Sequence, residues 1–198
     1  TTLACLLAFG LNAGSIHSSG ASAAGVFRDG VNHLLGPVTI LVCAWMFSST
    51  LKELEAVDVL ARLLAGNFPE WLFPFVVFLT GACISFTTGT SWGTMGVLMP
   101  LALPLALHLN PDAAAALAPA TVAAVFSGAV FGDHCSPLSD TTIVSSISCG
   151  IEPVDHVKTQ LPYALIAALT AATMGFLPGG FGLSPWLSLL AGGTALAC

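Results

Sequence analysis

Long stretches without a charged residue constrain this chain more than any other feature of its sequence. Asp, Glu, Lys and Arg are absent from residues 1–27, 30–51, 71–107, 113–132, 141–151 and 159–198. Only 7% of the 198 residues are charged and 56% are hydrophobic, whereas a soluble domain has about 25% charged residues. Since a membrane-spanning helix needs about 20 mostly apolar residues, the sequence predicts an all-α polytopic membrane protein.

The charge balance argues against nucleic-acid binding. Four basic and ten acidic residues give a formal net charge of −6, which offers no cationic surface to phosphate groups. The six cysteines lie mostly inside apolar stretches and lack the spacing of a zinc site. We therefore expect them to pack between helices, and we expect no nucleic-acid partner.

The charge-free stretches divide a single transmembrane domain, residues 1–198, into segments. We predict spans over 1–16, 34–51 and 161–177, an interfacial amphipathic helix over 52–66, and a partial span over 184–198. Between the first two spans, the small and polar residues of 14–30 favour an irregular connection. Both terminal segments break off within an apolar pattern, so we expect a fragment of a longer polypeptide.

Hydroxyl groups interrupt the charge-free stretch at 71–107. Ser85–Thr94 contains six hydroxyl-bearing residues and two glycines, with no charge that would draw it to the surface. Such a segment is tolerated at membrane depth only where protein or a water-filled cavity surrounds it. We therefore predict a re-entrant hairpin over 71–107 with this segment at its tip. The plain alternative is that these hydroxyls bond to their own helix.

The densest polar cluster is Gly132–Thr142. Pro137 cannot donate to the helical ladder, so the sequence predicts one span over 113–151 that is broken near its middle. Asp133 and Asp140 are costly inside a bilayer unless a cavity or a cation compensates them. With no Lys or Arg in the cluster, a bound cation held by carboxylate, hydroxyl and carbonyl oxygens would balance the charge. Helix capping is the alternative for both carboxylates.

Two long motifs resemble the NhaC-type sodium/proton antiporters of the ion transporter superfamily. The first is FGDHCSPLSDTTIVSS at 131–146, followed by DHVKTQLPYAL at 155–165. The second is SFTTGTSWGTMGVLMPLALPLA at 85–106. The resemblance extends over 35–177 and implies an inverted-repeat transporter, in which each repeat has a re-entrant hairpin followed by a broken helix.

The resemblance also implies a function and a set of site residues. It implies sodium/proton antiport by alternating access across the cytoplasmic membrane, with sodium bound between the hairpin tip and the break. Exchange of small carboxylates or amino-acid-like solutes stays open as an alternative. The implied ion-binding residues are Thr88, Thr90 and Ser91 at the tip and Asp133, Ser136, Ser139, Asp140 and Thr141 at the break.

Proton exchange has its own candidates, Asp133 and the adjacent His134. A histidine titrates near neutral pH, although a lone histidine can equally be a hydrogen-bonded part of the fold. No cofactor is expected beyond the transported Na⁺ and H⁺. The expected partners are the lipid bilayer, the remainder of the transporter and, as an open alternative to a monomer, a second copy in a homodimer.

Two other function classes fit the sequence less well. A membrane-embedded hydrolase would use Ser136, His134 and one aspartate, but the adjacent Asp133 and His134 cannot orient each other as a triad requires, and no nucleophile-elbow pattern is present. An ion channel is disfavoured because two interrupted motifs suit occlusion better than a continuous wet pore. We therefore expect a transporter rather than an enzyme.

Overall fold

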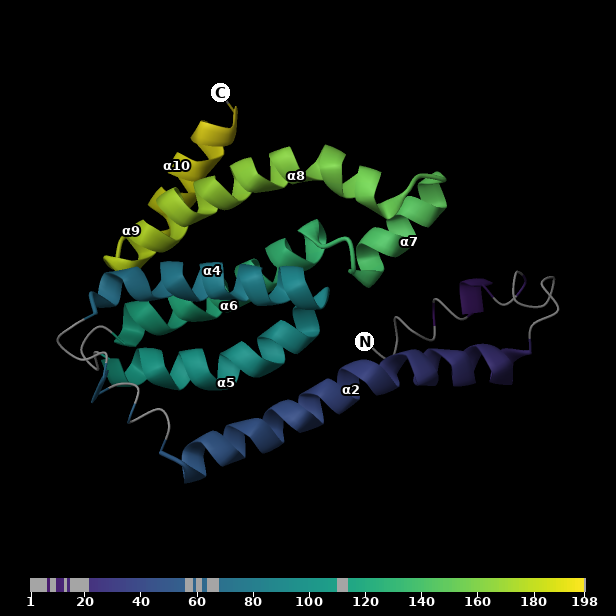
Figure 1. Ribbon diagram of the computed structural model, residues 1–198, viewed down its shortest axis with the longest axis horizontal. Helices are drawn as coiled ribbons and strands as arrows, with labels where there is room; N and C mark the ends of the chain where they lie inside the picture. The colour runs from purple at the N-terminus through teal and green to yellow at the C-terminus, as the bar shows by residue number, and fades with distance from the viewer. Residues whose placement is uncertain are drawn as a thin grey trace. The chain divides into compact units, whose positions relative to one another are not determined.

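The structure, a computed structural model, describes residues 7, 10–12, 14, 22–55, 59, 62–63, 68–109 and 114–197. The chain divides into two compact units, Thr1–Ile40 and Leu41–Cys198. In the described part every regular element is a helix, which confirms the all-α class (Figure 1). The segments long and apolar enough to cross a membrane are Glu70–Thr88, Ser91–Leu109, Ala116–Cys149 and Pro153–Gly180. The chain is thus a multi-pass membrane protein.

The first long helix, α2, covers Ala23–Glu53. Its start is capped by Ser22, whose Oγ accepts the backbone N–H of Gly25 at 3.0 Å and so satisfies one of the amides that a helix start leaves unpaired. The helix begins before the span predicted from residue 34. The expected irregular connection is therefore wrong for residues 23–30, because a local cap starts the helix early.

Two further predicted segments lie mostly outside the described residues, and a third overlaps a described helix. The predicted span over 1–16 and the interfacial helix over 52–66 lie mostly outside the described residues. The predicted partial span over 184–198 corresponds to helix α10, Pro185–Ala197.

A short 3₁₀ turn, Glu70–Leu72, leads into a helical hairpin of α4, Phe73–Thr88, and α5, Ser91–Leu109. The two helices pack against each other and are joined only by Gly89 and Thr90. Gly89 has a left-handed backbone, φ 69°, which glycine adopts without a Cβ penalty. The hydroxyl-rich segment is therefore helical apart from these two residues. Each arm is long enough to cross a membrane, so the re-entrant topology stays a prediction.

A four-residue break separates α6, Ala114–Cys135, from α7, Asp140–Cys149. Pro137 lies within it, as the sequence predicts. The 22 residues of α6 correspond to about 33 Å at the α-helical rise, close to the thickness of a bilayer core. Whether α6 and α7 form one broken span therefore stays a prediction.

The chain returns from α7 through a long helical run. Gly150 ends α7 with φ 66°, and α8, Pro153–Thr170, starts with a proline in its first turn, where the missing N–H has no cost. A π-helical segment, Ala171–Phe176, and α9, Leu177–Gly180, follow without interruption. The helix thus begins before the span predicted at 161–177.

The hydrophobic core lies where α4, α5 and α6 pack on one another and on the π-helical segment. The rings of Phe78 on α4 and Phe176 in the π-helical segment stack with centroids 4.8 Å apart. This packing holds α4 against both α6 and the return helix.

Candidate ion site at the hairpin tip and the helix break

Glycines bring the backbones of α4 and α6 into direct contact. A Cβ added to Gly128 would overlap the carbonyl oxygen of Phe78. A Cβ added to Gly132 would overlap the carbonyl oxygen of Ala82 and lie 2.6 Å from the amide nitrogen of Phe86. Small residues allow this close approach, which is typical of helix pairs in membranes. The last turns of the two helices are therefore held together on the approach to the site.

Ser85 fixes this contact with a hydrogen bond between helices. Its side chain is fully buried, and its Oγ donates to the carbonyl oxygen of Ala129 on α6 at 2.6 Å. Thr121, also fully buried, instead donates to Leu117 in its own helix at 2.8 Å. Sequence reasoning placed Ser85 in the polar tip but not in the site, since the sequence carries no signal for its partner.

The turn of the hairpin lies against the break. A Cβ added to Gly89 would lie 2.9 Å from both the carbonyl carbon and the carbonyl oxygen of Leu138 and 3.1 Å from its Cβ. Residues 49 positions apart along the chain thus meet backbone to backbone. The structure therefore brings together the two polar interruptions from which the sequence-predicted site residues come.

The break is closed by hydrogen bonds of its own. The amide of Ser136 donates to the carbonyl of Asp133 at 3.2 Å, and the amide of Ser139 donates to the carbonyl of Ser136 at 3.4 Å. Ser136 is fully buried, and its Oγ accepts the amide N–H of Leu138 at 3.2 Å. The serine hydroxyl thus shapes the four-residue turn around Pro137.

The two carboxylates lie at opposite ends of their helices, Asp133 at a C-terminus and Asp140 at an N-terminus. Asp133 is half-buried in the last turn of α6, and Asp140 is exposed in the first turn of α7. Neither carboxylate forms a hydrogen bond or ion pair with another described residue. Negative charge is stabilised at a helix N-terminus and destabilised at a C-terminus. The location of Asp140 is therefore favourable without a ligand, whereas that of Asp133 is not.

The capping alternative for Asp140 is not what the structure shows, because Ser139 occupies the N-cap of α7 and makes no side-chain cap hydrogen bond. Instead, the Oγ of Ser139 lies 2.7 Å from the Oγ1 of Thr141. Ser139 is fully buried, whereas Thr141 is exposed. The two residues that flank Asp140 in the sequence thus bring their hydroxyl oxygens together at the start of α7.

The predicted tip residues make local hydrogen bonds. Thr88 is exposed, and its Oγ1 donates to the carbonyl of Ile84 at 2.8 Å. Thr90 is half-buried, and its Oγ1 accepts the amide N–H of Gly93 at 3.3 Å. Ser91, half-buried, begins α5. The hydroxyl of Thr88 therefore bonds as the plain alternative predicted, although a donating hydroxyl oxygen keeps lone pairs for a ligand.

His134 contributes its backbone rather than its imidazole to the contacts described. Its side chain is exposed, and its carbonyl oxygen accepts the Nε2 amide of Gln160 on α8 at 3.1 Å. No group of three or more His, Cys, Asp or Glu suited to a metal ion lies among the residues that the structure describes. The oxygens gathered at the break are mainly hydroxyls and backbone carbonyls.

The sequence profile of the Na⁺/H⁺ antiporter family matches residues 1–178. The chain belongs to the Na⁺/H⁺ antiporter family. It is 41% identical over 152 residues to an uncharacterized protein of Haemophilus influenzae, covering 77% of this chain and 28% of that protein. No solved structure matches the chain at a significant level.

Two relatives with named activities extend this comparison. The Na⁺/H⁺ antiporter NhaC of Alkalihalophilus pseudofirmus is 34% identical over 149 residues, which cover 72% of this chain and 29% of the relative. The malate-2H⁺/Na⁺-lactate antiporter of Bacillus subtilis is 33% identical over 119 residues, which cover 56% and 24%. This family member therefore spans less than a third of the length of each of these relatives.

Proposed function

We propose that this protein contributes to sodium/proton antiport by alternating access, with the ion bound where the hairpin tip meets the break. Membership of the antiporter family supports the reaction class. The observation that carries the location is the backbone contact between Gly89 and Leu138, because it joins the tip and the break. Broken helices near the centre of a transporter commonly supply carbonyl and side-chain oxygens to a coupling ion.

Asp133 is the strongest candidate for the carboxylate that binds sodium. It lies at the C-terminus of α6, where the partial negative charge of the helix end opposes its own charge. A cation at this point would be attracted both by the carboxylate and by the partial negative charge of the helix end. The proposed additional oxygens come from Ser136, Ser139, Asp140 and Thr141 at the break and from Thr88, Thr90 and Ser91 at the tip.

Proton exchange is proposed for Asp133, with His134 as the alternative. A proton and a sodium ion that compete for one carboxylate give exchange when the site changes its access only with one of them bound. The exposed imidazole of His134 would instead pass protons between water and this carboxylate. The cargo ions Na⁺ and H⁺ are the only non-protein groups that the proposal requires.

Exchange of an organic solute is the second candidate function. It is supported by the Bacillus subtilis relative, which is named a malate-2H⁺/Na⁺-lactate antiporter. In both functions the same break would bind the coupling ions. The difference would lie in residues that contact the solute.

A hydrolase fits the site less well than a transporter. The hydroxyl of Ser136 is fully buried and holds the amide of Leu138, so a substrate carbonyl could not approach it in this conformation. The imidazole of His134 is exposed and makes no described hydrogen bond to Ser136. We therefore propose that the chain has no hydrolytic activity.

Sodium-driven proton movement in inverted membrane vesicles tests the proposal. The vesicles would contain the complete polypeptide that carries these 198 residues, and a fluorescent pH indicator would follow the internal proton concentration. Adding sodium without an organic solute should collapse a pre-formed proton gradient. A response only when a small carboxylate, such as malate or lactate, or an amino acid is also present would establish the second candidate, and no response under any of these conditions would contradict both.

A further inference from the structure

Apart from the bond between Thr173 and Leu169 at the junction with the π-helical segment, one side-chain hydrogen bond among the described residues joins α8 to another element. Gln160, half-buried on α8, donates from Nε2 to the carbonyl oxygen of His134 at 3.1 Å. The two residues are 26 positions apart, and the break, α7 and the turn at Gly150 lie between them. This hydrogen bond therefore closes the segment 134–160, which contains the break and starts next to Asp133.

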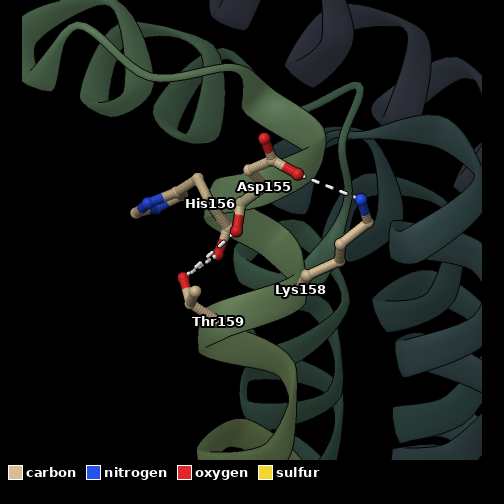
Figure 2. Close-up of polar contacts among 4 residues, drawn as sticks. All are labelled: Asp155, His156, Lys158 and Thr159. Carbon is tan, nitrogen blue, oxygen red and sulfur yellow. Dashed lines mark hydrogen bonds and ion pairs between the residues drawn. The ribbon is translucent and has the colours of Figure 1, made fainter.

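The neighbouring polar side chains on α8 do not reach across in this way. Figure 2 shows that Lys158 pairs with Asp155, with Nζ and Oδ1 3.0 Å apart. The hydroxyl of Thr159 donates to the carbonyls of Asp155 and His156 at 3.2 and 2.8 Å. These interactions stay within the first turns of α8. Gln160, next along the chain, is the residue whose hydrogen bond leaves the helix.

The carbonyl that Gln160 binds belongs to the helix end that carries Asp133. The last carbonyls of a helix have no partner within it, and the turn that contains them frays unless other donors hold them. In α6 the amide of Ser136 holds the carbonyl of Asp133, and Gln160 holds the next one, of His134. Both carbonyls of this pair are thus occupied, one from the break and one from α8.

We infer that Gln160 is a positioning residue for sodium binding, which holds the last turn of α6 and with it the position of Asp133 next to the break. This inference rests on the proposed function. Gln160 acts through the backbone of His134 and does not contact the ion. Its loss should therefore weaken sodium binding while leaving the maximal exchange rate largely intact.

The test compares Gln160→Leu, which removes the amide but keeps a side chain of similar size, with Thr159→Val as the matched control. Thr159→Val removes only hydrogen bonds within α8. In vesicles, Gln160→Leu should raise the half-saturating sodium concentration roughly three- to tenfold, as expected for loss of one hydrogen bond. Thr159→Val should leave it unchanged. An unchanged value in Gln160→Leu, or an equal rise in both variants, would overturn the inference.

Hydrogen–deuterium exchange provides a readout that does not depend on transport. In Gln160→Leu the amides of residues 133–139 should exchange faster than in the wild type and in Thr159→Val, because the end of α6 has lost a restraint. Equal exchange in all three proteins would show that Gln160 does not hold this turn. If the exchange changes as expected but wild-type vesicles show no sodium response, the proposed function fails and the structural role of Gln160 stands.

Discussion

The left-handed turn at Gly89 rests directly on the backbone of Leu138. A methyl group at position 89 would lie 2.9 Å from the carbonyl carbon and from the carbonyl oxygen of Leu138, which is closer than van der Waals contact allows. No side chain lies between the hairpin tip and the break at this point. The tip and the break are therefore adjacent in space, which is what an ion site shared between them requires.

Replacing Gly89 with alanine should separate the tip from the break. The variant combines a left-handed backbone at a non-glycine residue, which costs about 1–2 kcal/mol, with a clash against Leu138. We expect loss of most sodium-driven proton movement in vesicles. Gly150→Ala is the control, because Gly150 has the same left-handed backbone, φ 66°, but open space around an added Cβ. Equal activity of the two variants would contradict the proposed link.

Replacing Gly132 with alanine should disrupt the contact between α4 and α6. The added methyl group would overlap the carbonyl of Ala82 and approach the amide nitrogen of Phe86 to 2.6 Å. Overpacking of this kind costs about 1–3 kcal/mol, which should lower the melting temperature of the purified protein. Gly193→Ala in α10, where nothing lies within 4 Å of the new Cβ, should be neutral or slightly stabilising. A melting temperature of Gly132→Ala at or above the wild-type value would argue against the close contact.

The two carboxylates should differ in their effect on stability when replaced by asparagine. Asp133→Asn removes an unfavourable charge from a helix C-terminus and should stabilise the protein, whereas Asp140→Asn removes a favourable one from an N-terminus and should destabilise it, each by about 0.3–1 kcal/mol. If both side chains bind sodium, both variants should nevertheless lose sodium-coupled exchange. Wild-type exchange by Asp140→Asn would leave Asp140 with the helix-stabilising role alone.

Sodium affinity should fall as the pH falls. Protons and sodium compete for the same carboxylate oxygens in the proposed site, so protonation of Asp133 or Asp140 removes the ligand. The half-saturating sodium concentration, measured in vesicles at a series of pH values, should rise toward acidic pH. The same value at every pH would place the carboxylates outside the ion site.

The re-entrant topology of the hairpin can be tested by thiol labelling. Single cysteines at Pro69, Leu107 and Thr87, all exposed, would be placed in a background without native cysteines. A re-entrant hairpin puts Pro69 and Leu107 on one side of the membrane, so an impermeant reagent should label both from that side. The same reagent should label the cysteine at position 87 slowly, and less in the presence of sodium. Rapid labelling of position 87 from the opposite side would show that α4 and α5 are two ordinary spans.

Local chemistry made part of the site predictable. The Gly89 turn and the break around Pro137 lie where the sequence interrupts its apolar pattern. Glycine adopts the left-handed backbone of the turn without a penalty, and proline lacks the N–H that a continuous helix needs. Yet Pro100, Pro104, Pro119 and Pro162 lie inside helices that continue past them. Prolines are tolerated in membrane helices because neighbouring groups satisfy the freed carbonyls, so proline alone could not identify the break.

The sequence by itself determined that the chain is a multi-pass helical membrane protein, because its uncharged apolar stretches are as long as a spanning helix requires and a helix pairs its backbone groups within one segment. Tertiary structure alone decided that Ser85 bonds to Ala129 and Gln160 to His134, rather than each to its own helix. A hydroxyl or amide finds its partner by distance in space. For Ser85 that distance is set by glycines of α6 that let the backbones of α4 and α6 touch, and no local pattern encodes which helix will lie on the other side.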